Sequence, residues 1–384
     1  MKEYIEKGSW NKRAFTFINK LIAKHGIDSP NYDLNMKPFA VFDWDNTSII
    51  GDVEEATFYY LVTELRFKID PEELYEIIRK NVDKGDFSEK YTNMEGQRVN
   101  IEKISADVYK AYKELYQKSE SLAGAFPLDK IKETDAYKEF VTKIIFRYQA
   151  ADFDKNAEDP YCWMTFLFTH YTKEEIYELC NEAFSFVKNQ RPKIEKFISP
   201  DIKSQAGRIE TSYFVGMGDV PEMVDLFKTL DENGIDVYVV SASSQDIVRA
   251  FATANSYKFE EEKVLGLRLA KDYDGKILPI LDKSYPLTQK EGKSETIRKL
   301  IQNETNYGPI LVGGDSDGDF DMLTVFKESA LGIIIDVDRR GKINELKKAS
   351  LAGSDRFVIQ ARDKFAKTFI EEERSKECIL KTMK

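Results

Sequence analysis

The chain has 384 residues, of which 32% are charged and 42% hydrophobic, and its net charge at neutral pH is −10. This acidic balance argues against nucleic acid and anionic membranes as partners, because both require a basic surface. The 12% of aromatic residues excludes a disordered chain, and the length predicts about two domains. No apolar run is long enough for a membrane span.

Cysteine and histidine are scarce in this sequence. The three cysteines, Cys162, Cys180 and Cys378, have no metal-ligand spacing and form no disulfide framework, so we expect them to be chemically inert. With only two histidines a zinc enzyme is disfavoured, and His170 is predicted to have a packing or surface role. Acid–base chemistry is therefore expected to fall to carboxylates.

The first part of the chain has no hydrophobic signal core. We therefore expect a cytoplasmic protein, or a periplasmic or secreted one if a signal peptide has been removed. Residues 1–36 are predicted to be helical, because apolar side chains recur at a spacing of three and four residues before Gly26. Residues 38–42 form a short apolar run ending at Asp43, which predicts a buried strand.

A long stretch from about 52 to 206 is rich in Glu, Lys and Tyr and poor in Gly and Pro. It shows helical spacing throughout, and we expect it to form a separate helical domain inserted into the chain. After about residue 212, helices alternate with short apolar strands, and a C-terminal helix is expected over about 360–384. The predicted strands are 236–240, 310–312 and 331–335, with a hairpin over 264–269 and 276–280.

The alternation of strands and helices predicts an α/β fold with a parallel sheet and helices on both faces. The corresponding division of the chain is 1–51, 52–206 and 207–384. In such sheets a ligand lies beyond the carboxyl ends of the strands. Because Asp43, Ser241 and Asp315 each follow an apolar strand, they are expected to gather at one edge of the sheet.

Two carboxylates, Asp43 and Asp45, directly follow the first predicted strand and are two residues apart. Thr47 follows Asp45 at the same spacing. One carboxylate could act as a nucleophile while the other transfers a proton. The structural alternative is a turn at the strand end in which Asp45 caps a helix.

Residues 313–323 form a second acidic feature, with four aspartates within seven positions after another apolar strand. Such a cluster repels itself unless a cation intervenes, and oxygen ligands favour Mg²⁺. An acidic loop that only caps the next helix is the alternative. An EF-hand calcium loop is excluded, because the Glu that would complete it is missing at the required offset; Glu328 lies elsewhere.

Hydroxyl and lysine side chains supply candidate phosphate ligands. Ser241, Ala242 and Ser243 lie between a strand and a helix, where backbone N–H groups suit a phosphate, although helix capping by Ser243 or Ser244 is equally consistent. Lys293 opens another helix and could neutralise a phosphate or hold a carboxylate, but taken by itself it is more typical of a solvated lysine.

In their order and context these motifs resemble those of the haloacid dehalogenase-like (HAD) hydrolases, in particular the phosphoserine phosphatase-like branch. The resemblance covers residues 38–55 and about 212–340. It implies a Rossmann-like core and a large helical cap inserted after the first motif. The matching residues are, in motif order, Asp43, Asp45 and Thr47; Ser241; Lys293; and Gly314, Asp315 and Asp319.

The resemblance also implies roles for these residues. Asp43 would attack phosphorus and form an aspartyl-phosphate, and Asp45 would protonate the leaving oxygen and then activate water. Ser241 and Lys293, with Ala242 and Thr47, would bind the phosphoryl oxygens. The implied cofactor is Mg²⁺, held by Asp43, Asp315, Asp319 and the backbone carbonyl of Asp45.

The stretch from Phe39 to Glu55, which contains the first motif and the acidic residues Asp52, Glu54 and Glu55, looks most like that of phosphocholine phosphatases. An aromatic segment over 161–171 includes Trp163. We hypothesise that these acidic and aromatic side chains form a cage for an ammonium group, held by cation–π attraction. The alternative is that the aromatic residues are only the core of the cap.

The sequence thus predicts a Mg²⁺-dependent phosphomonoesterase for a small amine-bearing ester such as phosphocholine, phosphoethanolamine or phosphoserine. Two alternatives stay open: a HAD phosphatase for another small metabolite, and a non-catalytic binding protein with the same fold. The expected partner is a small phosphorylated metabolite, and the sequence gives no oligomeric state.

Overall fold

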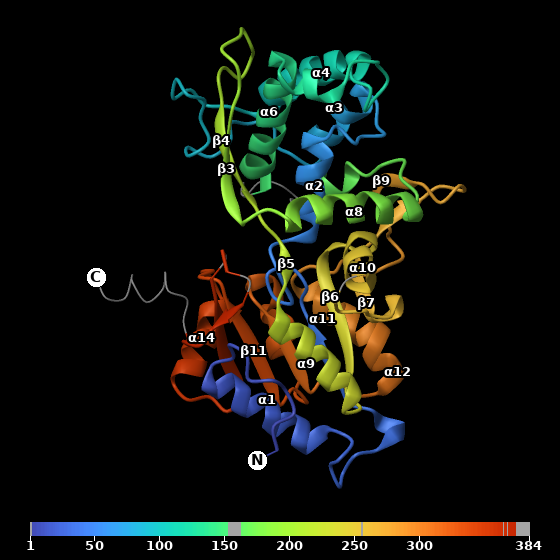
Figure 1. The fold of residues 1–384 in the computed structure, drawn as a ribbon, viewed down its shortest axis with the longest axis vertical. Helices are drawn as coiled ribbons and strands as arrows, with labels where there is room; N and C mark the ends of the chain where they lie inside the picture. The colour runs from blue at the N-terminus through green and yellow to red at the C-terminus, as the bar shows by residue number, and fades with distance from the viewer. Residues whose placement is uncertain (1, 153–162, 255, 364, 367, 374–384) are drawn as a thin grey trace. The chain divides into compact units, whose positions relative to one another are not determined.

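A computed structural model of the protein describes residues 2–152, 163–254, 256–363, 365–366 and 368–373 (Figure 1). The chain divides into two compact units. The first comprises residues 1–53, 216–268 and 283–384, and the second comprises residues 54–215 and 269–282. Within the described residues, no helix is both long and apolar enough to cross a bilayer.

The first unit is built on a seven-stranded sheet whose strand order is β13-β12-β11-β10-β1-β6-β7. Every neighbouring pair is parallel except β12 with β13. The α/β fold class with a parallel core is confirmed. The strands are β1 (Phe39–Phe42), β6 (Asp236–Ser244), β7 (Val264–Leu267), β10 (Leu311–Gly314), β11 (Leu331–Asp336), β12 (Phe357–Arg362) and β13 (Phe369–Ile370).

Helices cover both faces of this sheet, as expected for strands that are apolar on both sides. Val41 and Val312 pack into a core cluster with side chains of α11, α13 and α14, whereas Phe42 meets Phe227 of α9 with ring centroids 4.7 Å apart. The helices of this unit are α1 (Lys12–His25), α9 (Pro221–Glu232), α10 (Gln245–Ala254), α11 (Glu291–Ile297), α12 (Asn303–Thr305), α13 (Phe320–Thr324) and α14 (Ile343–Leu351).

A short antiparallel ribbon of β2 (Ile49–Ile50) and β5 (Gly218–Asp219) completes the first unit.

Two predictions for the ends of the chain were wrong in detail. The N-terminal helix spans only Lys12–His25, because Gly26 ends it as predicted but no helix precedes Asn11, whose side chain caps its first turn. The segment expected to start a C-terminal helix at 360 belongs instead to strands β12 and β13, and residues 374–384 lie outside the described part.

The second unit is mainly helical. Its helices begin at recognisable caps: Asp70 forms a capping box with Glu73 at the start of α3, and Thr172 forms one with Glu175 at the start of α8. The helices are α2 (Val53–Thr63, whose first residue belongs to the first unit), α3 (Pro71–Arg79), α4 (Ile101–Lys118), α5 (Leu128–Lys132), α6 (Asp135–Asp152), α7 (Trp163–Phe166) and α8 (Lys173–Lys188).

Two antiparallel hairpins accompany these helices: β3 (Lys193–Ile198) with β4 (Glu210–Val215), and β8 (Leu269–Lys271) with β9 (Ile277–Leu281). The hairpin predicted over 264–280 is therefore shorter, because its first half is strand β7 of the main sheet. Both hairpins belong to the second unit, so its bounds differ from the expected insertion at 52–206.

Candidate active site

The candidate site lies where three adjacent strands of the main sheet end. Strand β1 is hydrogen-bonded to β10 on one side and to β6 on the other, with Phe42 opposite both Gly313 and Val239. Because the three strands are parallel, their carboxyl ends meet at one edge of the sheet. Asp43 follows β1 and Asp315 follows β10. Ser241 lies within β6, in the half of the strand nearer its carboxyl end.

Three carboxylates converge at this edge. Asp43, Asp315 and Asp319 are all buried, and each offers an oxygen that lies within 4.8 Å of the others. Oxygens bound to one Mg²⁺ ion at about 2.0–2.1 Å can be no more than about 4.2 Å apart, so a small closure of the cluster would bring all three into ligand distance. The donor set therefore fits Mg²⁺, and Asp45 contributes no carboxylate to this cluster.

Lys293, from the start of α11, lies between two members of the cluster. Its Nζ donates to Oδ1 of Asp43 and to Oδ1 of Asp319, both at 2.6 Å, and its side chain is buried. The other oxygen of Asp43 accepts from the hydroxyl of Thr47 at 3.0 Å. The hydroxyl of Ser48 donates to the backbone carbonyl of Asp43 at 2.6 Å. Asp43 is thus fixed through its carboxylate and its backbone.

The carboxylate of Asp45 faces a different set of donors. Its Oδ2 accepts from the hydroxyls of Ser241 at 3.1 Å and Ser243 at 2.8 Å, and its Oδ1 accepts from the backbone N–H of Val53 at 2.8 Å. Burial raises the pKa of Asp45 to about 8, with a further contribution from the charge of Asp52. The protonated acid is therefore favoured at neutral pH, as a proton donor to a leaving oxygen requires.

Like charges and burial act together in the cluster. Burial, and then the neighbouring charge of Asp319, raise the pKa of Asp43 well above its ordinary value, while Lys293 opposes the shift. Burial also raises the pKa of Asp315, against the opposing charge of Arg339. Burial by itself lowers the pKa of Lys293, but the carboxylates of Asp319 and Asp43 more than offset this and the net shift is upward. The site thus favours an added cation.

The loop after β10 is shaped by one side chain. Oδ2 of Asp319 accepts from the backbone N–H groups of Asp315 and Ser316, both at 3.0 Å, and from the Ser316 hydroxyl at 3.2 Å. A Cβ atom at Gly314 would lie 2.4 Å from Cβ of Asp319, so a side chain at that position would displace it. Close packing against Asp319 therefore explains why glycine is needed at position 314, in addition to its place in the motif.

The structure thus brings Asp43, Asp45, Thr47, Ser241 and Lys293 together with the two aspartates of the acidic loop, all within the first unit. Sequence reasoning missed several participants in this arrangement. Ser243 was considered mainly as a helix cap, although it makes the shorter hydroxyl contact to Asp45. Ser48 and Arg339 were not considered, and no local motif marks them. Ala242 lies between the two serines that bind Asp45.

The residues predicted to bind an amine are divided between the units. Asp52 belongs to the first unit, where its charge acts on Asp45, whereas Glu54, Glu55 and Trp163 belong to the second. Residues 161 and 162 of the aromatic segment lie outside the described residues, as does Cys378, and Cys180 is buried. His170 is bonded to Glu73 at 2.8 Å within the second unit.

One face of the Trp163 ring is already covered by a cation of the protein. The guanidinium of Arg147 lies 3.7 Å from the ring centroid, and both side chains are buried. The carboxylate of Glu55 accepts from the hydroxyl of Tyr148 at 2.5 Å. An external ammonium would therefore have to use the opposite face of Trp163 or displace Arg147.

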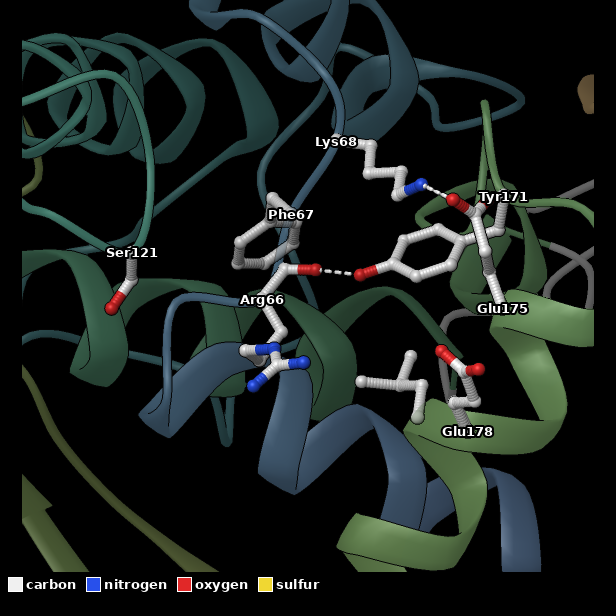
Figure 2. A pocket seen from close by; sticks show the side chains of 8 residues that line it. Arg66, Phe67, Lys68, Ser121, Tyr171, Glu175 and Glu178 are labelled. Atoms are coloured by element: carbon white, nitrogen blue, oxygen red, sulfur yellow. Dashed lines mark hydrogen bonds and ion pairs between the residues drawn. The ribbon is translucent and has the colours of Figure 1, made fainter.

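A hollow of about 400 Å³ lies within the second unit, and Figure 2 shows its lining. Several of its polar groups already have partners: Lys68 pairs with Glu175 across the hollow, Arg66 pairs with Glu182 at 3.0 Å, and the Tyr171 hydroxyl donates to the Arg66 carbonyl. None of the predicted site residues lines it, so we assign it no part in the chemistry.

Comparison with known structures gives a close match. A crystal structure of a conserved functionally unknown protein from Anaerococcus prevotii DSM 20548 is 53% identical to this chain, with a TM-score of 0.95 over 98% of this chain and 99% of that one. No family model and no curated protein matches.

More distant structures include a protein with unknown function from Bordetella pertussis Tohama I, 13% identical over 85% of this chain and 98% of that one, with a TM-score of 0.44. A phosphoserine phosphohydrolase-like protein from Francisella tularensis subsp. tularensis SCHU S4 is 12% identical over 84% and 94% of the two chains, with a TM-score of 0.38. We draw no argument from either. The chain belongs to the same family as the Anaerococcus prevotii protein. The segments that resemble the four motifs of haloacid dehalogenase-like (HAD) hydrolases meet at one edge of its mainly parallel sheet.

Proposed function

We propose that this protein is a Mg²⁺-dependent phosphomonoesterase that acts on a small amine-bearing phosphoester through an aspartyl-phosphate. The observation that carries the proposal is the buried cluster of Asp43, Asp315 and Asp319, with Lys293 2.6 Å from Asp43, at the carboxyl ends of β1 and β10. Carboxylates and a lysine buried together at this edge suit phosphoryl transfer, which depends on positioning and on neutralising charge.

In the first step, an oxygen of the Asp43 carboxylate forms a bond to phosphorus while the bond from phosphorus to the ester oxygen breaks. Asp45 gives its proton to that leaving oxygen, so the product leaves as an alcohol. In the second step, Asp45 takes a proton from water as the water oxygen attacks phosphorus. Inorganic phosphate leaves, and the carboxylate of Asp43 is restored.

The groups around Asp43 each have a task in these steps. Lys293, Ser241, Thr47 and the backbone of Ala242 would hold the phosphoryl oxygens, while the Ser241 and Ser243 hydroxyls fix the direction of Asp45. Asp43, Asp315 and Asp319, with the backbone carbonyl of Asp45, would hold Mg²⁺. When bound, the ion offsets the repulsion between a carboxylate nucleophile and an anionic phosphate.

We also propose that the second unit serves as a cap that selects small substrates and excludes water from the reaction. The proposed amine specificity rests on Asp52, Glu54 and Glu55, whose carboxylates would attract an ammonium group. Trp163 would take part only through the ring face opposite Arg147, or after displacement of Arg147. A phosphatase for another small metabolite is the second candidate, and the pairing of Trp163 with Arg147 is the observation that favours it.

The test is phosphate release from phosphocholine, phosphoethanolamine, phosphoserine, a sugar phosphate and a nucleotide, with Mg²⁺ and with EDTA. Asp43→Asn should lower kcat by at least about 1,000-fold, because it removes the nucleophile without changing the volume of the side chain. The matched control is Asp321→Asn, which removes a charge from the same acidic loop but lies outside the cluster; its activity should stay near that of wild type.

Each outcome of this panel separates the alternatives. Strongest activity on the amine esters supports the whole proposal. Strongest activity on the sugar phosphate or nucleotide keeps the mechanism and discards amine specificity. No release that depends on Asp43 from any of these esters would favour a binding protein with the HAD fold.

A further inference from the structure

A surface arginine contacts the candidate metal cluster from outside the four motifs. Nε of Arg339 lies 2.5 Å from Oδ2 of Asp315. The arginine side chain is 47% exposed, whereas that of Asp315 is 3% exposed. The arginine therefore reaches the cluster from the solvent side, on the loop between β11 and α14.

The backbone that carries Arg339 is anchored by a buried ion pair. Nζ of Lys347 donates to the carbonyl of Arg339 at 2.9 Å and to Oδ1 of Asp336 at 2.7 Å. The same oxygen of Asp336, the last residue of β11, accepts the backbone N–H of Asp338 at 3.0 Å. Because Asp336 and Lys347 are buried, the position of Arg339 is set by the sheet and by α14.

A second attachment joins this loop to the acidic loop. Oδ1 of Asp317 accepts the backbone N–H of Ile343 at 2.8 Å. Gly341 has a φ of 127°, and a Cβ atom there would lie 2.1 Å from Oδ2 of Asp317. Glycine is therefore required both by the backbone conformation and by the close approach of the Asp317 carboxylate.

We propose that Arg339 is a positioning residue for the metal site: its Nε holds Oδ2 of Asp315 and thereby fixes the orientation of that carboxylate beside Asp43 and Asp319. The inference rests on the proposed function in one respect, since it takes the three carboxylates as the ligands of Mg²⁺. Metal-binding carboxylates are commonly fixed in this way by a hydrogen bond to the oxygen that faces away from the ion, and the loss of such a partner lowers metal affinity by about 10–100-fold.

The charge and the hydrogen bond of Arg339 have opposite effects on Mg²⁺ binding. Its positive charge repels the ion, so removal of charge alone would tighten binding. Its hydrogen bond fixes the ligand, so removal of the bond would weaken binding. The direction of the change in affinity therefore separates the effect of the charge from the effect of the hydrogen bond.

The experiment is a calorimetric titration of the full chain with Mg²⁺, for wild type and Arg339→Gln. The dissociation constant of the variant should rise about tenfold or more, and the Mg²⁺ concentration for half-maximal activity should rise in parallel while kcat at saturating Mg²⁺ stays nearly constant. Arg340→Gln is the matched control, because the neighbouring arginine is exposed, carries the same charge and, among the described residues, forms no ion pair with the carboxylates of the cluster. Its affinity should stay within about twofold of wild type.

A second variant separates charge from geometry. Arg339→Lys keeps the charge but replaces the planar Nε–H donor with a flexible ammonium, so it should also bind Mg²⁺ more weakly. Unchanged or tighter binding in Arg339→Gln, or wild-type affinity in Arg339→Lys, would overturn the positioning role. If wild type itself bound no Mg²⁺, the metal part of the proposed function would fail, and that result is distinct from a failure confined to Arg339.

Discussion

Within the described residues, two lysines are buried between pairs of carboxylates, one lysine in each compact unit. In the first unit, Lys293 lies 2.6 Å from an oxygen of Asp43 and 2.6 Å from an oxygen of Asp319. In the second unit, Lys143 lies 2.7 Å from Asp107 and 2.5 Å from Glu139. Distance and burial alone do not tell the two clusters apart.

The surroundings of Lys143 point to a structural role. Glu139 and Lys143 lie on α6 and Asp107 lies on α4, and the two oxygens of Asp107 also accept the backbone N–H groups of Gln205 and Ala206 at 2.8 Å each. The network therefore ties two helices to the loop before β4. Each contact joins two parts of the scaffold, and the described structure places no third carboxylate within metal-ligand distance of the pair.

The surroundings of Lys293 differ in kind. Its carboxylates come from the end of β1 and from the loop after β10, and Asp315 adds a third carboxylate at the same edge. Burial and mutual repulsion raise the pKa values of Asp43 and Asp315, so this cluster carries an electrostatic strain that a cation would relieve. A buried lysine–carboxylate pair is therefore not in itself a sign of chemistry. Convergence of strand ends and excess negative charge are the more specific signs.

The largest effect that would test this comparison is on stability. Lys143→Met leaves two buried carboxylates without their cation, and breaking a buried pair in this way should lower the free energy of unfolding by about 3–5 kcal/mol. Urea denaturation measures it. Lys118→Met is the control, because Lys118 pairs with Glu114 on the exposed surface of α4 and should leave stability almost unchanged. The fraction of Lys143→Met protein that stays folded should keep the wild-type kcat. A loss of kcat comparable with that of a Lys293 variant would mean that the Lys143 cluster is not merely structural.

The next effect is on catalysis. Lys293→Met removes the cation adjacent to the nucleophile, so kcat should fall by about 100- to 1,000-fold, as when one stabilising donor is lost from a reacting oxyanion. Steady-state assays at saturating Mg²⁺ measure this, with Lys299→Met as the control, since Lys299 is exposed and pairs with Glu295, one helical turn before it in the chain. If the variant kept a tenth or more of the wild-type kcat, Lys293 would have no direct part in catalysis. Its cluster would then be structural, like that of Lys143.

The same comparison shows how far the sequence could predict this protein. Asp43, Ser241 and Asp315 were placed at one edge because each follows an apolar strand and parallel strands share their carboxyl edge. The Lys143 network had no such marker: its partners Asp107 and Ser204 are 36 and 61 residues away in the sequence, on elements whose packing no local pattern specifies.

Other features could not be predicted because they depend on the local backbone conformation. Arg339 reaches Asp315 only because the loop after β11 has positive φ values of 63° at Asp338 and 127° at Gly341, and no motif specifies that path. Residues 357–362 were expected partly as helix but pair with β11 as a strand. An apolar segment of that length is compatible with either structure, and the sheet beside it decides the outcome.

The smallest expected effect is that of a substitution at Gly314, in the backbone next to the Lys293 cluster. In Gly314→Ala the added methyl group would press on Cβ of Asp319, the near end of a side chain that the acidic loop already holds through Oδ2. We expect a loss of about 1–3 kcal/mol in the free energy of unfolding, the usual cost of overpacking, and weaker Mg²⁺ binding as Asp319 moves. In Gly218→Ala the same methyl group meets no atom within 4 Å, so that variant is the matched control. If Gly314→Ala lost stability but bound Mg²⁺ like wild type, Asp319 would serve the loop rather than the ion, and the cluster around Lys293 would be closer to the structural network of Lys143 than its third carboxylate suggests.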